Sequence, residues 1–235
     1  MKMTLMQHFS ELRRRLLWTM FVFILSFGLG WVVAPYVELF LTRPLLNIWH
    51  DAALLYVGLS DGLMIQFSLA TLVALIITIP VLIWHIWAYV APGLHKNEKE
   101  FLLPIFVLSP ILFICGAGFA FYVLFPIVFK FFIDLNETAS VPAVLFPAIR
   151  GYLAFVIDLL KVFGIAFQLP LVMIILNRVG LLPKQKAIKS RKYVIILIFI
   201  MAAVLTPPDI VSQILLAVPM WLLFEVSLFF MRKDV

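Results

Sequence analysis

Long apolar runs constrain this chain more than any other feature of its sequence. In a helix, about 20 apolar residues cover the ~30 Å hydrocarbon core of a bilayer, because each residue adds 1.5 Å. Four runs reach that length, near residues 16–37, 63–90, 102–129 and 152–176. The 235 residues are 65% hydrophobic and only 13% charged, whereas soluble domains carry roughly 25% charged residues. The sequence therefore predicts an all-α integral membrane protein.

Two further apolar runs, near residues 193–205 and 210–231, are harder to place. The first holds about 13 residues, or ~20 Å of helix, before Thr206-Pro207-Pro208-Asp209 ends it. The pair is therefore either a re-entrant hairpin buried in protein or a crossing where the bilayer is locally thinned. In both cases the C-terminus returns to the side from which it came.

The distribution of Lys and Arg predicts sidedness, because basic residues collect on the cytoplasmic side of membrane proteins. One face has four basic residues, Arg43, Lys130, Arg150 and Lys161. The other has the remaining fourteen: Lys2, Arg13, Arg14, Arg15, Lys96, Lys99, Arg178, Lys184, Lys186, Lys189, Arg191, Lys192, Arg232 and Lys233. Both termini are therefore expected in the cytoplasm, and the net charge of +6 reflects topology rather than nucleic-acid binding.

Prolines inside the apolar runs predict kinked helices, since each removes a backbone hydrogen bond and leaves a carbonyl that needs another partner. They are Pro80, Pro104, Pro110, Pro126, Pro170 and Pro219. A set of bent helices favours a concave shape over a tight bundle. Without internal repeats or a soluble segment, residues 1–235 are expected to form a single transmembrane domain.

Acidic residues near the inner membrane surface are the strongest candidates for a binding site. A helical pattern before the first run places Glu11 beside His8 and Arg15, and the short segment between the second and third runs contains Glu98 and Glu100. An interfacial helix and a solvated turn are the simpler readings. Carboxylates beside an anionic leaflet instead favour a cationic ligand, above all a guanidinium, which a carboxylate binds in a bidentate manner.

Polar residues within the runs are further candidates, because they are costly at membrane depth. Asp158 and Lys161 are spaced to pair on one helical face, either as a structural ion pair or as part of a proton relay. Gln168 can bond a partner helix, and Glu225 lies near the end of the last run. The sequence contains no GxxxxGK[ST] or HExxH motif. An enzyme is therefore not expected, nor is any cofactor or metal.

Five segments resemble the TatC family, the multi-spanning receptor component of the twin-arginine protein translocase, and together they extend over essentially the whole chain. They are HFSELRRRL (8–16), IWAYVAPGLHKNEKEF (86–101), FYVLFPIVFKFF (121–132), FGIAFQLPLV (163–172) and RKYVIILIFIMAAVLTPPDIVSQILLAVPMWLLFE (191–225). The resemblance implies six transmembrane helices in a glove-like concave arrangement, with short fifth and sixth spans. It favours local thinning over the re-entrant alternative.

The resemblance also implies function. Proteins of this family sit in the bacterial cytoplasmic (inner) membrane and bind signal peptides that carry two consecutive arginines. They export folded cargo in an oligomeric complex with single-span TatA-type and TatB-type partners, using the proton-motive force. Position by position, Glu11 and Glu98 match the acids that bind the arginines. Other members of the same cytoplasmic patch are matched by His8, Arg13, Tyr89, Pro92 and Leu94.

Further family positions fall outside this patch. Pro44 matches a proline of the first external segment, and Asp209 closes the TPPD turn. Gln168 stands where the family usually has a buried glutamate, so it keeps hydrogen bonding but loses ionisation. Thr206 and Gln213 match a polar cluster that is expected to share docking of a partner helix with Gln168.

A proton-coupled small-solute transporter is the alternative function, with Asp158, Lys161 and Glu225 as its relay. It predicts substrate-dependent proton flux from this chain alone in liposomes.

Overall fold

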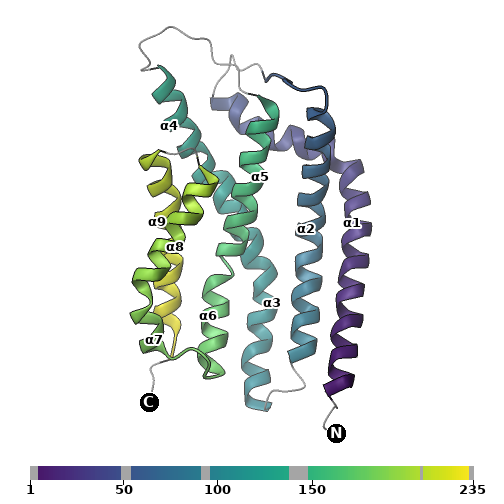
Figure 1. The fold of residues 1–235 in the computed structure, drawn as a ribbon, viewed down its shortest axis with the longest axis vertical. Helices are drawn as coiled ribbons and strands as arrows, with labels where there is room; N and C mark the ends of the chain where they lie inside the picture. Colours follow the sequence, from purple (N-terminus) through teal and green to yellow (C-terminus); the bar gives the residue numbers. More distant parts are fainter. Residues whose placement is uncertain (1–4, 49–53, 91–95, 138–147, 207–208, 233–235) are drawn as a thin grey trace. The chain divides into compact units, whose positions relative to one another are not determined.

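Every regular element in the described part of the chain is helical, as the apolar runs predict. The computed structural model describes residues 5–48, 54–90, 96–137, 148–206 and 209–232, with side chains there except at 5–9, 47–48, 90, 96–102 and 136–137. The elements, drawn in Figure 1, are α1 (Leu5–Ile48), α2 (Asp61–Val90), α3 (Lys96–Phe119), η2 (Ala120–Leu124), α4 (Phe125–Glu137), α5 (Ile149–Ala166), α6 (Leu169–Arg178), α7 (Lys184–Lys189), α8 (Arg191–Leu205) and α9 (Ile210–Phe230).

Within the part of the chain that the structure describes, five segments are long and apolar enough to cross a membrane. They are Ser10–Leu46, Asp61–Tyr89, Leu103–Leu135, Ile149–Arg178 and Ile210–Phe230. The helix α8 has 15 residues, or ~22 Å, and is the short element that the sequence predicts. The helix α9, the expected sixth span, has 21 residues, or ~32 Å, and is the shortest of these five segments.

The first helix is longer than predicted. The sequence places the end of the first span near Val37, before an external segment, but α1 continues to Ile48 and includes Pro44. Tertiary contacts support this continuation: Leu41 and Leu45 are buried, and the Tyr152 hydroxyl donates a 2.6 Å hydrogen bond to the carbonyl of Leu41. These contacts outweigh the local cost of proline in a helix.

Two of the six expected kinks coincide with a change of helix geometry. Pro126 follows η2, a turn of π-helix that accommodates a missing i→i−4 hydrogen bond. Pro170 is near the start of α6, just after the chain leaves α5 and passes through Phe167 and Gln168. By contrast, α2, α3 and α9 continue as α-helices through Pro80, through Pro104 and Pro110, and through Pro219, respectively.

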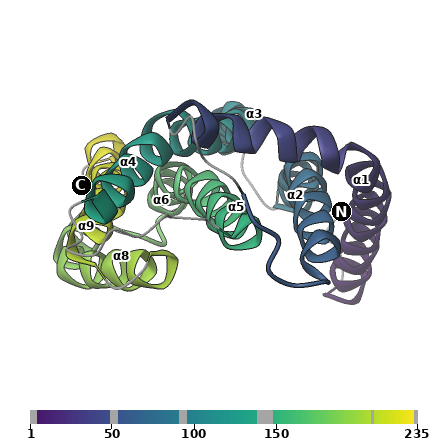
Figure 2. The same ribbon diagram turned by 90° about the horizontal axis from the view of Figure 1, so that it is seen from above.

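The helices divide into two compact units. Unit 1 comprises Met1–Glu38 and Leu63–Ile111, and unit 2 comprises Leu39–Gly62 and Leu112–Val235. In unit 1, α1 and α2 lie side by side (Figures 1 and 2). Their backbones approach closely at Gly30, where a Cβ atom would lie 2.7 Å from the carbonyl oxygen of Ala70. The Gln66 side chain adds a 3.1 Å hydrogen bond to the carbonyl of Trp31.

In unit 2, α3 and α5 are in contact through glycines. A Cβ at Gly116 would lie 2.5 Å from the Phe163 carbonyl oxygen, and a Cβ at Gly164 would lie 2.5 Å from the Phe113 ring. At the other end of α5, Asp61 accepts hydrogen bonds from the backbone N–H groups of Val57 and Gly58, at 3.2 and 2.7 Å, and from Arg150 at 3.1 Å. Asp61 therefore fastens the start of α2 to the start of α5.

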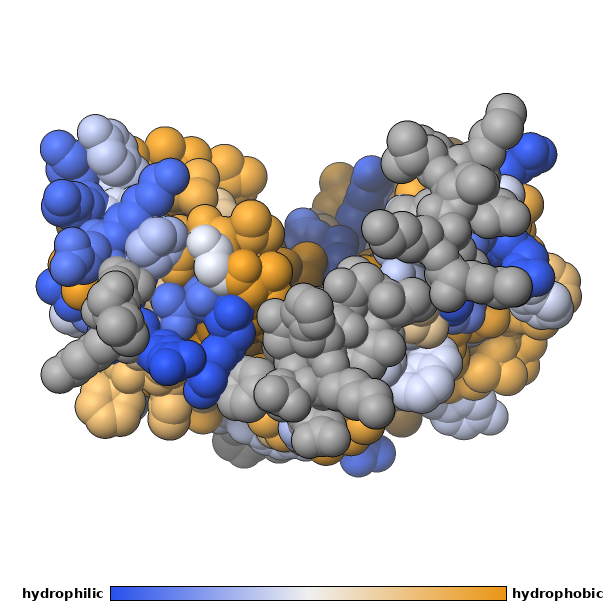
Figure 3. Space-filling view, turned by 90° about the horizontal axis from the view of Figure 1, so that it is seen from below, coloured by the Kyte–Doolittle hydropathy of each residue, from blue (hydrophilic) through white to orange (hydrophobic). Residues whose placement is uncertain are grey.

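The last helices of unit 2 form a second set of contacts. Helices α8 and α9 lie side by side (Figures 1 and 2). Next to α7, the Lys184 ammonium donates to the carbonyl of Met231, and the backbone N–H of Arg232 donates to the Asn177 side chain. Beneath them, Ala187 packs with Met173, Phe224, Leu228 and Met231. On this end of unit 2, hydrophilic side chains gather beside apolar ones (Figure 3).

Candidate functional site

Glu11 on α1 is held by an arginine one turn further along the same helix. The Nε and Nη2 atoms of Arg15 lie 3.0 and 2.5 Å from Oε1 of Glu11. The Glu11 side chain is only 14% exposed and that of Arg15 is 23% exposed. Within the described part of the chain, the second carboxylate oxygen, Oε2, is buried without a hydrogen-bond partner. The structure therefore contains a half-satisfied carboxylate already bound to a guanidinium.

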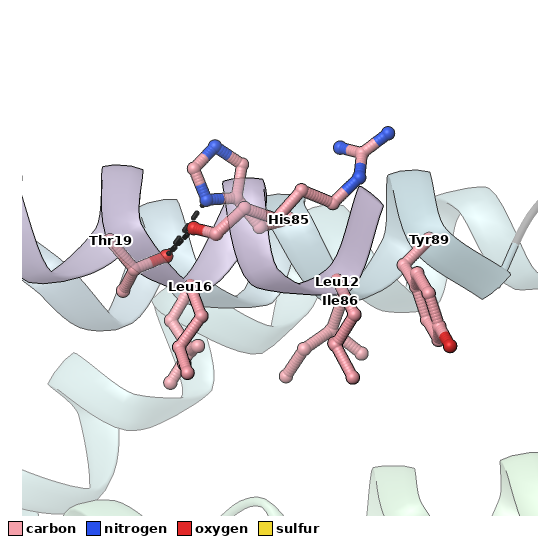
Figure 4. A pocket seen from close by; sticks show the side chains of 8 residues that line it. Leu12, Leu16, Thr19, His85, Ile86 and Tyr89 are labelled. Atoms are coloured by element: carbon pink, nitrogen blue, oxygen red, sulfur yellow. Dashed lines mark hydrogen bonds between the residues drawn. The ribbon is translucent and has the colours of Figure 1, made fainter. Parts of the chain in front are cut away.

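Two contacts connect this region of α1 to α2. Arg15 Nη2 also donates to the carbonyl of Ala88, at 3.3 Å. One turn further along α1, the Thr19 hydroxyl donates to the Arg15 carbonyl at 3.0 Å and lies 2.8 Å from Nδ1 of His85 (Figure 4). These bonds hold Arg15 and its neighbours in place beside the end of α2.

An apolar groove lies next to these polar contacts. Its lining residues are Leu12, Arg15, Leu16, Thr19, Leu82, His85, Ile86 and Tyr89. Figure 4 shows Leu12, Leu16, Ile86 and Tyr89 pointing to one side of the two helices, with His85 on the opposite side. The exposed leucines border a half-buried tyrosine, so the surface beside Glu11 offers apolar contact as well as charge.

The other residues of the predicted cytoplasmic patch are only partly described. His8 lies in the first turns of α1, and Arg13 is exposed on the same helix. Tyr89 is half-buried near the end of α2. Pro92 and Leu94 lie outside the described residues, and Glu98 lies near the start of α3 with a side chain that is outside them. The structure therefore brings Tyr89 beside α1, while a shared site for Glu11 and Glu98 stays a prediction.

The predicted docking residues are all in unit 2. Gln168 is half-buried in the break between α5 and α6. Thr206 ends α8, where its buried hydroxyl donates to the Ala202 carbonyl at 3.0 Å. Gln213 on α9 donates from Nε2 to the carbonyl of Phe199 on α8, also at 3.0 Å. The amide of Gln213 thus joins the two helices.

The two predicted structural residues have clear local environments. Pro44 is half-buried inside α1. Asp209 is the N-cap of α9: it accepts a 2.7 Å hydrogen bond from the backbone N–H of Ser212 and another from the Ser212 hydroxyl. An N-cap carboxylate satisfies a free N–H group and favours the positive end of the helix dipole.

The ionisable residues of the alternative relay are engaged in ion pairs. Lys161 Nζ lies 2.6 Å from Oδ1 of Asp158, as their spacing predicts. Glu225 accepts from Nη2 of Arg191 at 2.7 Å, which links α9 to α8. Among the residues that the structure describes, no group of three or more His, Cys, Asp and Glu side chains could hold a metal ion.

Several functional contacts were not anticipated from sequence. The i,i+4 spacing of Glu11 and Arg15 is a signal that could have predicted their pairing. Asp61, directly before a long apolar run, carries the signal of a helix start. In contrast, Arg15 and its acceptor Ala88 are 73 residues apart in the sequence, and Glu225 and its partner Arg191 are 34 residues apart. No local pattern could have revealed these two contacts.

Comparison with known proteins gives consistent matches over most of the chain. The family described as "Sec-independent protein translocase protein (TatC)" matches residues 7–219. The TatC protein of Magnetococcus marinus is 35% identical over 232 residues, which cover 98% of this chain and 84% of the relative. That of Rickettsia prowazekii is 37% identical over 225 residues, covering 94% and 90%.

A solved structure shares the same fold. The crystal structure of the twin-arginine translocase receptor TatC in DDM has a TM-score of 0.88 and 32% sequence identity, and the match covers 96% of this chain and 99% of that one. The fold, the family match and the sequence identity to bacterial relatives agree with one another. The chain therefore belongs to the TatC family of Sec-independent protein translocase proteins.

Proposed function

We propose that this chain is the receptor and core subunit of a twin-arginine translocase and that Glu11 and Glu98 bind the arginine pair of a signal peptide. Membership of the translocase family supports a transport role and not catalysis. The observation that carries the proposed site is the bond between Glu11 and the guanidinium of Arg15. That bond supports the proposal, because it brings a planar guanidinium against the carboxylate of Glu11.

The rest of the recognition patch comprises His8, Arg13, Tyr89, Pro92 and Leu94. Tyr89 lines the groove beside α1, together with exposed Leu12 and Leu16. This surface suits apolar residues of a signal peptide next to its arginines. Hydrogen bonds of a charged group contribute roughly 1.5–3 kcal/mol each, and the groove adds apolar burial.

The topology that goes with this function has six spans, a single concave transmembrane domain and both termini in the cytoplasm of a bacterial cell. Five long apolar segments support it, with α8 as the additional crossing. Because α8 spans only ~22 Å, it crosses where the bilayer is thinned.

Partner subunits of the single-span TatA and TatB type dock beside Gln168, Thr206 and Gln213, and the proton-motive force drives export in an oligomeric complex. Gln168 lies at a break in helical structure within an apolar segment, where polar groups need bonding partners. As an amide, this side chain contributes hydrogen bonds to docking and no proton transfer.

Binding of a synthetic twin-arginine signal peptide to the full-length protein in nanodiscs tests the proposed site. Glu11→Gln and Glu98→Gln should each weaken the peptide's affinity about tenfold or more, because each removes a charge-assisted hydrogen bond. Asp158→Asn, which removes an acid from the alternative relay, is the matched control and should leave the affinity unchanged. Unaltered binding in both glutamate variants would refute the site.

A further inference from the structure

The contact between Arg15 and Glu11 is geometrically incomplete. Nε and Nη2 of Arg15 converge on Oε1, while Oε2 is buried without a partner in the described part of the chain. A guanidinium that approaches a carboxylate side by side instead satisfies both oxygens with two parallel hydrogen bonds. Arg15 therefore leaves Oε2 of Glu11 without a hydrogen bond, and a guanidinium in the side-by-side position could donate one to it.

Arg15 also has a second acceptor close at hand. Its Nη2 donates to the carbonyl of Ala88, in the last turn of α2. The final carbonyls of a helix have no intrahelical donors, and residue 92, which follows Ala88 by four positions, is a proline without an N–H group. The negative end of the helix dipole favours a cation there as well. Arg15 can thus leave Glu11 without losing all of its partners.

We propose that Arg15 is a resident competitor at the Glu11 site, which an incoming cationic side chain must displace from the carboxylate. This inference rests on the proposed function, because it takes Glu11 as an acid that binds signal-peptide arginine. In the empty receptor Arg15 neutralises the carboxylate. On binding, Arg15 leaves Glu11 and keeps its hydrogen bond to the Ala88 carbonyl, and the peptide's guanidinium takes both oxygens of Glu11.

Competition of this kind sets a threshold of affinity. Displacing Arg15 reduces the apparent affinity of every ligand by the same factor, since only the receptor population with a free carboxylate can bind. A peptide arginine recovers the loss by also bonding Oε2, whereas a lysine ammonium provides a single charged point and lacks the planar fork. Twin-lysine peptides consequently fall below useful affinity, although Arg15 does not alter the ratio between the two peptides.

The test is peptide binding to the full-length protein in nanodiscs, using two signal peptides that differ only in carrying Arg-Arg or Lys-Lys. Arg15→Gln should tighten binding of both peptides, on the order of fivefold, with their ratio preserved, because a partly buried ion pair no longer has to be broken. A lost structural contact would weaken binding, so an increase in affinity cannot come from damage to the fold. Arg15→Lys, which keeps the charge with a poorer hold on the carboxylate, should give a smaller increase.

Arg14→Gln is the matched control, because Arg14 is exposed, adjacent in sequence and identical in charge. It should produce only a small gain that disappears at high ionic strength, whereas the gain from Arg15→Gln should persist, since contact pairs are screened less than exposed charges. Unchanged or weakened binding in both Arg15 variants would overturn the inference. In a Glu11→Gln background, Arg15→Gln should have no effect.

The two failures can be told apart. If Glu11→Gln weakens binding while neither Arg15 variant tightens it, the competitor is refuted and the proposed function stands. If Glu11→Gln leaves binding unaltered, the proposed role of Glu11 itself is refuted, and the competitor with it.

Discussion

Two arginine–glutamate pairs in this protein have the same chemistry and opposite structural settings. In unit 1, Glu11 and Arg15 belong to one helix and are four residues apart, so the bond between them adds no link between helices. In unit 2, Arg191 and Glu225 belong to α8 and α9 and are 34 residues apart. The local pair is the more buried of the two: Glu11 is 14% exposed and Glu225 is 27% exposed.

The difference separates a bond that can be exchanged from one that builds the fold. Replacing the partner of Glu11 by a ligand leaves the helices where they are, because α1 is also joined to α2 through Thr19 and His85. Replacing the partner of Glu225 would remove one of the links between α8 and α9. A binding site can therefore use the first kind of pair, while unit 2 depends on ties between distant residues: Gly116 against Phe163, Asp61 with Arg150, and Arg191 with Glu225.

The close contact between Gly116 and Phe163 should give the largest effect on the free energy of unfolding. Gly116→Val should lower the free energy of unfolding by about 1–3 kcal/mol or more, because its Cβ would lie 2.5 Å from a backbone oxygen that cannot move away cheaply. Thermal unfolding of the detergent-solubilised protein measures this loss. Gly118→Val in the same helix is the control, since nothing lies within 4 Å of its Cβ position. Equal loss in both variants would contradict the close packing of α3 on α5.

Asp61 provides the next test. Asp61→Asn should destabilise the protein, because Asp61 is buried and accepts hydrogen bonds from Val57, Gly58 and Arg150. Arg150→Gln should cost less, since the Arg150 side chain is 54% exposed and its ion pair is screened by solvent. Chemical unfolding of the two variants compares them directly. The reverse order would mean that the ion pair, and not the backbone contacts, fixes this turn.

The smallest effect on stability is expected for the ion pair between Arg191 and Glu225. A double-mutant cycle on Arg191→Gln and Glu225→Gln should give a coupling energy of about 0.5 kcal/mol, discounted because both side chains are partly exposed. Peptide affinity should be the same in all four proteins, in contrast to the Glu11 variants. A loss of peptide binding with Glu225→Gln would erase the distinction between an exchangeable and a structural pair.

Much of the fold is predictable from the length of the apolar runs. Four of the spans, and the stop at Thr206 and Asp209, follow from hydrophobic length and from proline. The ends of helices were less predictable. Helix α1 continues beyond Pro44 because its residues Leu41 and Leu45 are buried and because Tyr152, from α5, donates a hydrogen bond to the carbonyl of Leu41. Propensity is local, and packing against distant residues can override it.

The candidate site was predictable as a set of residues and less so as a set of bonds. Sequence indicated Glu11, and the i,i+4 spacing contains its pairing with Arg15. It could not indicate that Arg15 also reaches Ala88, that Thr19 meets His85, or that Gln213 bonds Phe199, because each of these contacts depends on how two helices pack.

The crossed glycines of unit 2 also limit how this unit can move. Gly116 admits the backbone at Phe163, and Gly164 admits the ring of Phe113, so each helix carries both a notch and a bulky residue for the other. Sliding α5 along α3 by one turn would move the Phe163 backbone away from Gly116 and the Phe113 ring away from Gly164, and would bring residues with a Cβ into these close contacts. During transport these two helices should therefore travel as one rigid piece, with any bending confined to segments outside their shared contact.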